Sequence, residues 1–456
     1  MFKDCQNTTD AFSRSTKLNF KQASVLFCFA ALLLLLSFTA PAHAETSQFH
    51  ELTPVVDISG TSSVNSANEA AKAAYLNGCK CVVIAPEANG TFAACASGLA
   101  GVLDAPILLS ADGGLSSETA DLINQLGACS AYIVGSTTVV PASVEHNLKA
   151  AGVKNVERIS ANDSCSASVA CAQKISLLSG NPSSQAIIAS ASNMCDVASL
   201  IPFAYKYKVP IFFTDEAVNA GNLTDEELGA IVSQTSATSK IYVAGDFSSV
   251  SKVNAEDTFG QLRVIRFQGS NSIDVSNTIA TYMTSELQET KQPFMNSKTI
   301  VISDKDTAAS KTEVIAGAAV AGKSGGVFLL SNGNVADIPF VKENPKNVSA
   351  VYVVGSNTTF NDNFKNLLKG NLNKWHVATF VSDDGSVYKT QQVWDGDKLT
   401  QPVEPQKQDY IFNGWYSSSA EDAVLHDFNK ALTSDVTVYA HWTSYEFHYM
   451  FMAFQK

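Results

Sequence analysis

The apolar positions between residues 80 and 355 fall into nine short runs, arranged as three sets of three. Each run is unbroken rather than alternating with polar positions, which predicts a strand that is buried on both faces. Buried strands of this kind are typical of parallel sheets with helices on each side. The runs lie at 81–85, 106–110, 131–135, 186–189, 210–214, 241–245, 299–303, 327–331 and 351–355.

The third run of each set has tyrosine as its second residue and ends in glycine, at Gly135, Gly245 and Gly355. These glycines are 110 residues apart both times. A fixed interval of this kind indicates an internal repeat. We therefore predict an α/β fold of three tandem, small parallel-sheet βαβαβ repeats.

The predicted repeats cover residues 52–154, 155–262 and 263–372. In parallel sheets the carboxyl ends of the strands share one edge, where ligands of open α/β sheets usually bind. Gly135, Gly245 and Gly355 end their strands at that edge, so they are candidate binding residues. The alternative is that glycine only permits the sharp turn from strand to loop.

The segments between the runs are predicted to be helices. Thr224 and Glu227 have the spacing of a capping box, in which each side chain accepts a hydrogen bond from the other residue's backbone amide. In the helix that follows, Leu228, Ile231 and Val232 are expected to line the buried face.

The pattern changes beyond residue 374, where short alternating runs flank turns rich in aspartate and glycine. Alternation of this kind predicts a small, mostly antiparallel β domain at 375–443, followed by a tail at 444–456. The tail has no sortase-type motif and is too short to span a membrane. All four tryptophans of the chain lie in this part: Trp375, Trp394, Trp415 and Trp442.

Residues 1–44 have the order of an export signal. Basic residues precede an apolar run at about 23–36, and the small residues Ala42 and Ala44 flank His43 after it. The run is shorter than the ~20 residues that cross a bilayer. We expect cleavage between Ala44 and Glu45, which leaves an extracellular chain without a transmembrane segment; the alternative is an uncleaved signal anchor.

The charge of the chain restricts its partners. Loss of residues 1–44, which carry four basic and two acidic side chains, would change the formal charge from −12 to −14. Such a chain is a poor ligand for nucleic acid. It also repels anionic polymers at long range, so contact with one requires a local basic patch, a bridging cation or uncharged groups.

Seven cysteines follow the predicted cleavage site, and their number is odd. Cys79 and Cys129 each precede an apolar run at the same end of one sheet, so we predict a Cys79–Cys129 disulfide. The alternative is that most of these cysteines are small buried hydrophobic residues. Cys79 and Cys81 have no second pair of ligands nearby, so we predict no metal site.

The repeated segments resemble the cell wall binding repeat type 2 family of Gram-positive surface proteins, in three copies over about 320 residues. The resemblance rests on 105–109 and 132–135, which keep the Ala-Pro-Ile-Leu-Leu and Tyr-Ile-Val-Gly elements of that family. It implies three repeats packed around a pseudo-threefold axis and non-covalent attachment to an anionic cell wall polymer.

The acidic positions of the family are mostly replaced. At the opening Asp-Arg element the three repeats have Ser62-Ser63, Asp163-Ser164 and Asn271-Ser272, so no copy keeps the arginine. At the aspartate of the following helix they have Phe92, Asp196 and Thr312. The resemblance therefore implies Asp163 and Asp196 as polymer-binding residues.

Residues 375–443 resemble the Listeria-Bacteroides repeat, also called the internalin B-repeat. The resemblance rests on 410–416, on Asp427-Phe428 and on 433–442. It implies a β-grasp-like spacer or adhesion module that meets a host or neighbouring surface. Trp415 and Trp442 could stack on sugars, or they could anchor the core of so small a domain.

Catalytic motifs are not recognisable. The chain lacks HExxH, GxSxG and a phosphate-binding loop, and we predict no cofactor. We expect a non-catalytic surface protein whose repeats attach it to the cell wall. The alternatives are an exported receptor for a small molecule or glycan and, less favoured, an enzyme that acts on wall glycan.

Overall fold

The computed structural model describes residues 51–286, 292–305, 312–355 and 359–446. The described chain divides into two compact units, a repeat unit at 52–373 and a C-terminal unit that begins at Lys374. The predicted signal segment, with Ala44 and Glu45, lies outside the described residues. Among the described residues, no helix is both long and apolar enough to cross a membrane.

The repeat unit contains three sheets, and all strands within them are parallel. The first sheet comprises β3 (Ile107–Ser110), β2 (Cys81–Pro86), β4 (Ser130–Val134) and β5 (Asn155–Ile159), in that order. The second comprises β7 (Ile211–Thr214), β6 (Ala186–Ser190), β8 (Ile241–Ala244) and β9 (Val264–Phe267). The third comprises β11 (Val327–Ser331), β10 (Thr299–Asp304), β12 (Ala350–Val354) and β1 (Val55–Asp57).

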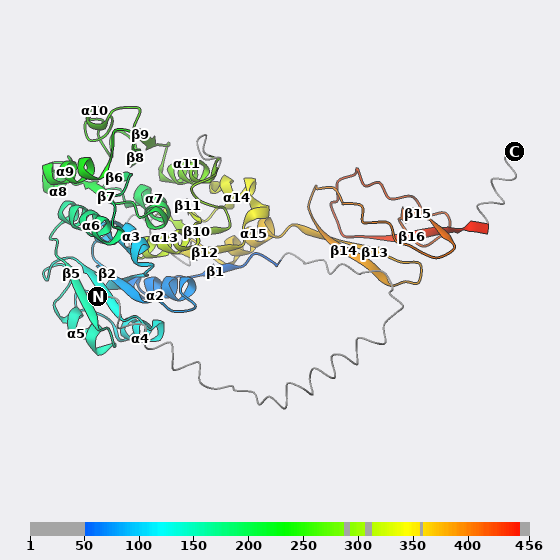
Figure 1. Cartoon of the computed structure of the whole chain (residues 1–456), viewed down its shortest axis with the longest axis horizontal. Coiled ribbons are helices and arrows are strands. Elements are labelled where there is room, and N and C mark those ends of the chain that lie inside the picture. Colours follow the sequence, from blue (N-terminus) through cyan, green and yellow to red (C-terminus); the bar gives the residue numbers. More distant parts are fainter. Residues whose placement is uncertain (1–50, 287–291, 306–311, 356–358, 447–456) are drawn as a thin grey trace. The chain divides into compact units, whose positions relative to one another are not determined.

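Each sheet borrows its fourth strand from another repeat. The predicted second repeat begins with β5, which pairs with β4 of the first, and β9 pairs with β8 in the same way. The third sheet is completed by β1, the first described strand, which pairs with β12 near the end of the unit. Figure 1 shows β1 in blue beside the yellow β12. The three repeats therefore form a closed ring. From the sequence we expected three strands in each layer, and predicted neither the fourth strand nor the ring.

The helices occupy equivalent places in the repeats. The first repeat contains α2 (Ser63–Ala74), α3 (Gly90–Leu103), α4 (Ser117–Leu126) and α5 (Ser143–Ala150). The second contains α6 (Ser164–Ser179), α7 (Met194–Tyr207), α8 (Glu216–Asn219), α9 (Asp225–Gln234) and α10 (Glu256–Phe259). The third contains α11 (Ser272–Thr284), α13 (Glu313–Ser324), α14 (Pro339–Glu343) and α15 (Asp362–Leu372).

The central helices α3, α7 and α13 pack against one another, one from each repeat, around the pseudo-threefold axis. Small side chains permit this close approach. A Cβ atom at Gly101 of α3 would lie 1.8 Å from the backbone oxygen of Tyr205 on α7, so only glycine fits there. The predicted fold class is thereby confirmed, because three parallel-sheet α/β repeats surround one shared core.

A polar cluster joins all three repeats near the carboxyl ends of the central helices. The hydroxyls of Tyr75 and Tyr205 are 2.5 Å apart and buried. Lys323 of α13 lies over the Tyr75 ring, 4.7 Å from its centroid, and pairs with Asp104 at the end of α3. Burial raises the pKa of both tyrosines, so both remain neutral and hydrogen-bonded.

The capping box predicted for α9 is present. Thr224 Oγ1 accepts from the Glu227 amide at 3.2 Å, and a Glu227 carboxylate oxygen accepts from the Thr224 amide at 3.0 Å. The buried face differs from the prediction, because Val232 is 65% exposed. Glu227 itself is fully buried. Its second carboxylate oxygen accepts from the backbone amide of Phe213 in β7, so both oxygens are hydrogen-bonded.

The C-terminal unit is one mixed sheet in the order β14 (Val387–Trp394), β13 (Trp375–Val381), β16 (Val436–Ser444), β15 (Tyr410–Tyr416). The central pair β13 and β16 is parallel, and the two outer pairs are antiparallel. Trp415 is fully buried and packs edge-on against Phe380, so it is a core anchor.

The predicted Cys79–Cys129 disulfide is wrong, because Cys79 keeps a free thiol. The strand register gives the reason. Cys81 pairs with Ser130, which places Cys129 level with Lys80 and one residue out of step with Cys79. Burial raises the pKa of the Cys79 thiol to about 11, so this thiol is protonated and poorly reactive at neutral pH.

Candidate functional site

The carboxyl ends of the strands form the rim of each sheet, and the three predicted glycines lie there. Gly135, Gly245 and Gly355 have φ angles of 129°, 109° and 141°, in the region that favours glycine. At Gly245, a Cβ atom would also lie 2.9 Å from the Cβ of Ser249 in the loop that follows. The turn at the rim therefore accounts for these glycines by itself, and their contact with a polymer stays a prediction.

The opening acidic position of each repeat is a helix cap. Ser62, Asp163 and Asn271 are the N-cap residues of α2, α6 and α11, and each side chain accepts a backbone hydrogen bond from the first turn. For Asp163 the donor is the amide of Ser166, at 2.7 Å. Serine, aspartate and asparagine cap helices about equally well, which explains why all three are tolerated here.

The second acidic position is different. Asp196 lies in the first turn of α7 and is 4% exposed. Its Oδ2 accepts from the Asn193 side-chain amide at 2.8 Å, whereas its Oδ1 is buried and has no hydrogen-bond partner in the described part of the chain. A Cβ atom at Gly245 would lie 3.2 Å from Oδ2, so this carboxylate lies against the glycine turn of β8.

We call Asn193, Asp196, Gly245, Asp246 and Ser272 the Asp196 site. Burial raises the pKa of the Asp196 carboxyl above its ordinary value, and the charge of Asp246 adds to this effect. The hydroxyl of Ser272 and the amide of Asn193 oppose it. The site therefore joins α7 and β8 of the second repeat to the first residue of α11 in the third repeat.

The equivalent positions of the other repeats hold no acid. Phe92 on α3 is buried among apolar side chains of the shared core. The Thr312 hydroxyl donates to the backbone oxygen of Glu87 at 2.7 Å. Among these three positions, only Asp196 carries a buried carboxylate.

The structure brings Asp196 and Gly245 together but places Asp163 elsewhere. The chain just before Asp163 belongs to the rim of the first sheet, where the Ser136 amide donates to the oxygen of Ala161. Asp163 therefore lies beside the turn of Gly135 rather than beside Asp196. Two residues of the same type in the same family motif have different surroundings.

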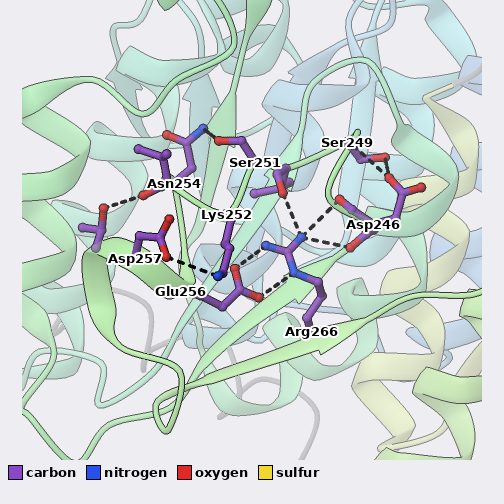
Figure 2. A network of polar contacts seen from close by, with 12 residues as sticks. Asp246, Ser249, Ser251, Lys252, Asn254, Glu256, Asp257 and Arg266 are labelled. Atoms are coloured by element: carbon purple, nitrogen blue, oxygen red, sulfur yellow. Dashed lines mark hydrogen bonds and ion pairs between the residues drawn. The ribbon is translucent and has the colours of Figure 1, made fainter.

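Sequence reasoning missed two arginines that hold the rim loops. Arg266 of β9 binds Glu256 through two hydrogen bonds, of 2.7 and 2.6 Å, and donates to the backbone oxygens of Gly245, Asp246 and Val250 (Figure 2). The arginine thus fixes the loop that carries one wall of the Asp196 site. Both members of this ion pair are at most 11% exposed.

Arg158 of β5 does the same in the first repeat. It pairs with Glu145 and donates to the oxygens of Gly135, Ser136 and Val140. The two arginines occupy the same register, opposite Ile133 and Val243 in the tyrosine-bearing strands. Ile133 and Val243 are 110 residues apart, so the repeat period was the signal in the sequence that could have identified these two arginines.

In the third sheet the two charges are exchanged, with the acid on the edge strand and the base on the helix. Asp57 of β1 lies opposite Val353, the register position of the two arginines, and pairs with Lys365 on α15. Burial raises the pKa of Asp57, but Lys365 and donors on Ser59 outweigh this effect and leave it below the ordinary value. The acid is therefore ionised and paired where the ring closes.

Family models match both units. Residues 57–145, most of the first repeat, match cell wall binding domain 2. Residues 376–441 match the Listeria-Bacteroides repeat domain. The second and third repeats share the sheet topology of the first.

The chain is similar to N-acetylmuramoyl-L-alanine amidase LytC of Bacillus subtilis (strain 168). The two are 23% identical over 345 residues, which cover 75% of this chain and 61% of the amidase. The chain thus spans about three fifths of the length of that relative.

Two solved structures share the fold. Cwp6 from Clostridium difficile superposes with a TM-score of 0.58 at 19% identity, over 76% of this chain and 54% of Cwp6. Cwp8 from the same organism gives a TM-score of 0.57 at 19% identity, over 78% of this chain and 55% of Cwp8. The chain therefore carries a cell wall binding domain 2 segment in its repeat unit and a Listeria-Bacteroides repeat in its C-terminal unit.

Proposed function

We propose that the protein is a non-catalytic surface protein of the bacterial cell wall, which it binds non-covalently through the rims of its three repeats. The Asp196 site is the observation that carries this proposal. A buried carboxylate oxygen without a partner costs stability, so its presence at a sheet rim is best explained by a ligand that supplies the missing donor.

The chemistry of the site defines what it would bind. Asp196 and Asp246 are both acidic, so the site does not itself attract an anionic group. A sugar hydroxyl or an amine of the wall polymer can donate to Asp196 Oδ1. The proposed contact is therefore a hydrogen bond to an uncharged or cationic part of the polymer, and its anionic groups would be met elsewhere on the protein or through a cation.

The rim geometry supports binding by preformed loops. Arg158 and Arg266 each donate to several backbone oxygens of their rim loops, which holds these loops in place before a ligand arrives. Preorganised loops lose less conformational entropy on binding.

The proposal is tested by sedimenting the full chain with purified wall sacculi. We expect binding that is lost when the anionic polymer is stripped, and about tenfold weaker binding by Asp196→Asn, which replaces an acceptor oxygen with a donor. Asp121→Asn, at an exposed position of α4, is the matched control and should bind normally. Binding that survives stripping would favour a receptor for another ligand.

A second candidate function is suggested by the similarity to an amidase. An enzyme that cleaves wall peptides would release dye from labelled sacculi in proportion to time. We expect no release by the full chain at concentrations that saturate binding. Release that disappears on substitution of a single carboxylate would establish the enzyme instead.

A further inference from the structure

The C-terminal unit contains a cavity that the wall-binding proposal does not use. Its volume is about 440 Å³, within the range of about 300–1,000 Å³ typical of small-ligand sites. Four segments line it: the turn after β13, the chain that leads into β15, the loop after β15, and the last strand β16. We infer that this cavity binds a neutral saccharide.

Aromatic rings form part of the lining. Tyr410 enters from the start of β15, and Tyr439 and Trp442 come from β16. The C–H faces of a sugar ring pack on aromatic faces, which combine apolar contact area with a polar rim. Tyr410 is 39% exposed, so the part of its ring that Lys407 does not cover is open to a ligand at no cost to the core.

The charges in the cavity cancel. Lys407 lies 4.1 Å from the centroid of Tyr410 and pairs with Asp383. The ammonium and the carboxylate neutralise each other, so the cavity does not present an unpaired charge to an ionic ligand. Both groups still have hydrogen-bonding capacity for hydroxyls.

Polar groups complete the lining. Ser382 and Ser419 place hydroxyls at the cavity, and His441 lines it while its Nε2 lies 2.8 Å from the oxygen of Ser418. Hydroxyls beside aromatic faces, with balanced charge, match a ligand that has both apolar ring faces and many hydroxyls. A neutral saccharide has this chemistry, and binding of it would make this unit a second, independent attachment point.

The test uses the tryptophans, all four of which lie in this unit, so their fluorescence reports on it alone. The full chain is titrated with cellotriose, maltotriose, mannotriose and tri-N-acetylchitotriose, and binding is checked by calorimetry. We expect at least one trisaccharide to give a saturable change. Tyr410→Ala should weaken that binding about tenfold, and Tyr410→Phe should preserve it.

Tyr445→Ala is the matched control, because Tyr445 is similarly exposed, at 46%, but does not line the cavity. Thermal melts of each variant exclude unfolding as the cause of any loss. The inference is overturned if no trisaccharide binds, if both alanine variants weaken binding equally, or if a sulfated trisaccharide binds better than every neutral one. None of these results depends on sacculus binding by the repeats, so the two proposals fail separately.

Discussion

Asp196 is a residue whose burial is expected to reduce the stability of the fold. It is buried, its Oδ1 has no partner in the described structure, and its pKa is raised above the ordinary value. Each of these features disfavours the folded protein at neutral pH, when the carboxyl must ionise. Structural features that lower the stability of a protein are found mainly at sites that have a function.

Replacement of Asp196 by asparagine should therefore stabilise the protein while it weakens wall binding. We expect a gain of about 1 kcal/mol in the free energy of unfolding near neutral pH, because the buried charge is removed. Chemical denaturation of wild type and Asp196→Asn measures it. A loss of stability would show that the carboxylate is stabilising and would weaken the functional argument.

The same substitution should change the dependence of stability on pH. A carboxyl whose pKa is raised in the folded protein binds a proton more tightly there than in the unfolded chain. Stability then increases as pH falls from the folded pKa of Asp196 toward the lower unfolded value. Asp196→Asn should lack this increase, so the difference in unfolding free energy between the two proteins should shrink on acidification; a constant difference would contradict the assignment.

At the scale of elements, the rim loops depend on the strand that each sheet takes from another repeat. Arg158 and Arg266 sit on these borrowed strands and bind the loops after β4 and β8. The third borrowed strand, β1, carries Asp57 and pairs with Lys365 instead. An arginine-bearing strand placed beside β12 would meet Lys365, so the reversed charges favour β1 at that position.

The reversed pair predicts a specific double-mutant result. Asp57→Arg and Lys365→Glu should each lower the free energy of unfolding by about 1 kcal/mol, because each leaves two like charges together. The combined variant should recover most of the loss, since it recreates the charge order of the first two repeats. Lys369→Glu, at an exposed position of the same helix, is the control.

Urea denaturation of the four proteins gives the coupling energy. Strict additivity of the two single losses would show that Asp57 and Lys365 do not interact in solution. The prediction concerns stability only, because neither residue belongs to the Asp196 site.

At the scale of the whole repeat unit, the ring closes through its two ends. The amide of Thr53 donates to the side-chain oxygen of Asn373 at 2.7 Å, and its hydroxyl donates to the oxygen of Val348. The first and last residues of this unit are therefore neighbours. Adjacent ends are the condition under which circular permutation is tolerated.

A permuted repeat unit, with residue 373 joined to residue 52 and new ends between Asn181 and Pro182, should therefore fold. Both residues at the new ends are exposed. We expect its Tm to lie within about 2 °C of the unpermuted 52–373 unit, a shift that corresponds to about 1 kcal/mol for a unit of this size. Calorimetry checks this, and a 59–373 variant without β1 should melt far lower. Equal melting of that deletion variant would show that β1 does not hold the ring closed.

The sequence by itself determined the parts of the fold that depend on local pattern. Unbroken apolar runs at 110-residue spacing are sufficient to predict parallel strands and three repeats, because burial on both faces leaves no polar positions in a strand. The Thr224–Glu227 capping box was likewise predictable, since both of its hydrogen bonds are made within one turn of helix.

Tertiary structure decided everything that depends on pairing between distant residues. The pairing of β1 with β12, the register that separates Cys79 from Cys129, and the burial of Glu227 against β7 all join segments that local pattern treats separately. The same reason explains why Asp163 and Asp196 have different surroundings. Asp163 bonds to its own helix, whereas Asp196 is defined by β8 and α11, which only the folded ring brings beside it.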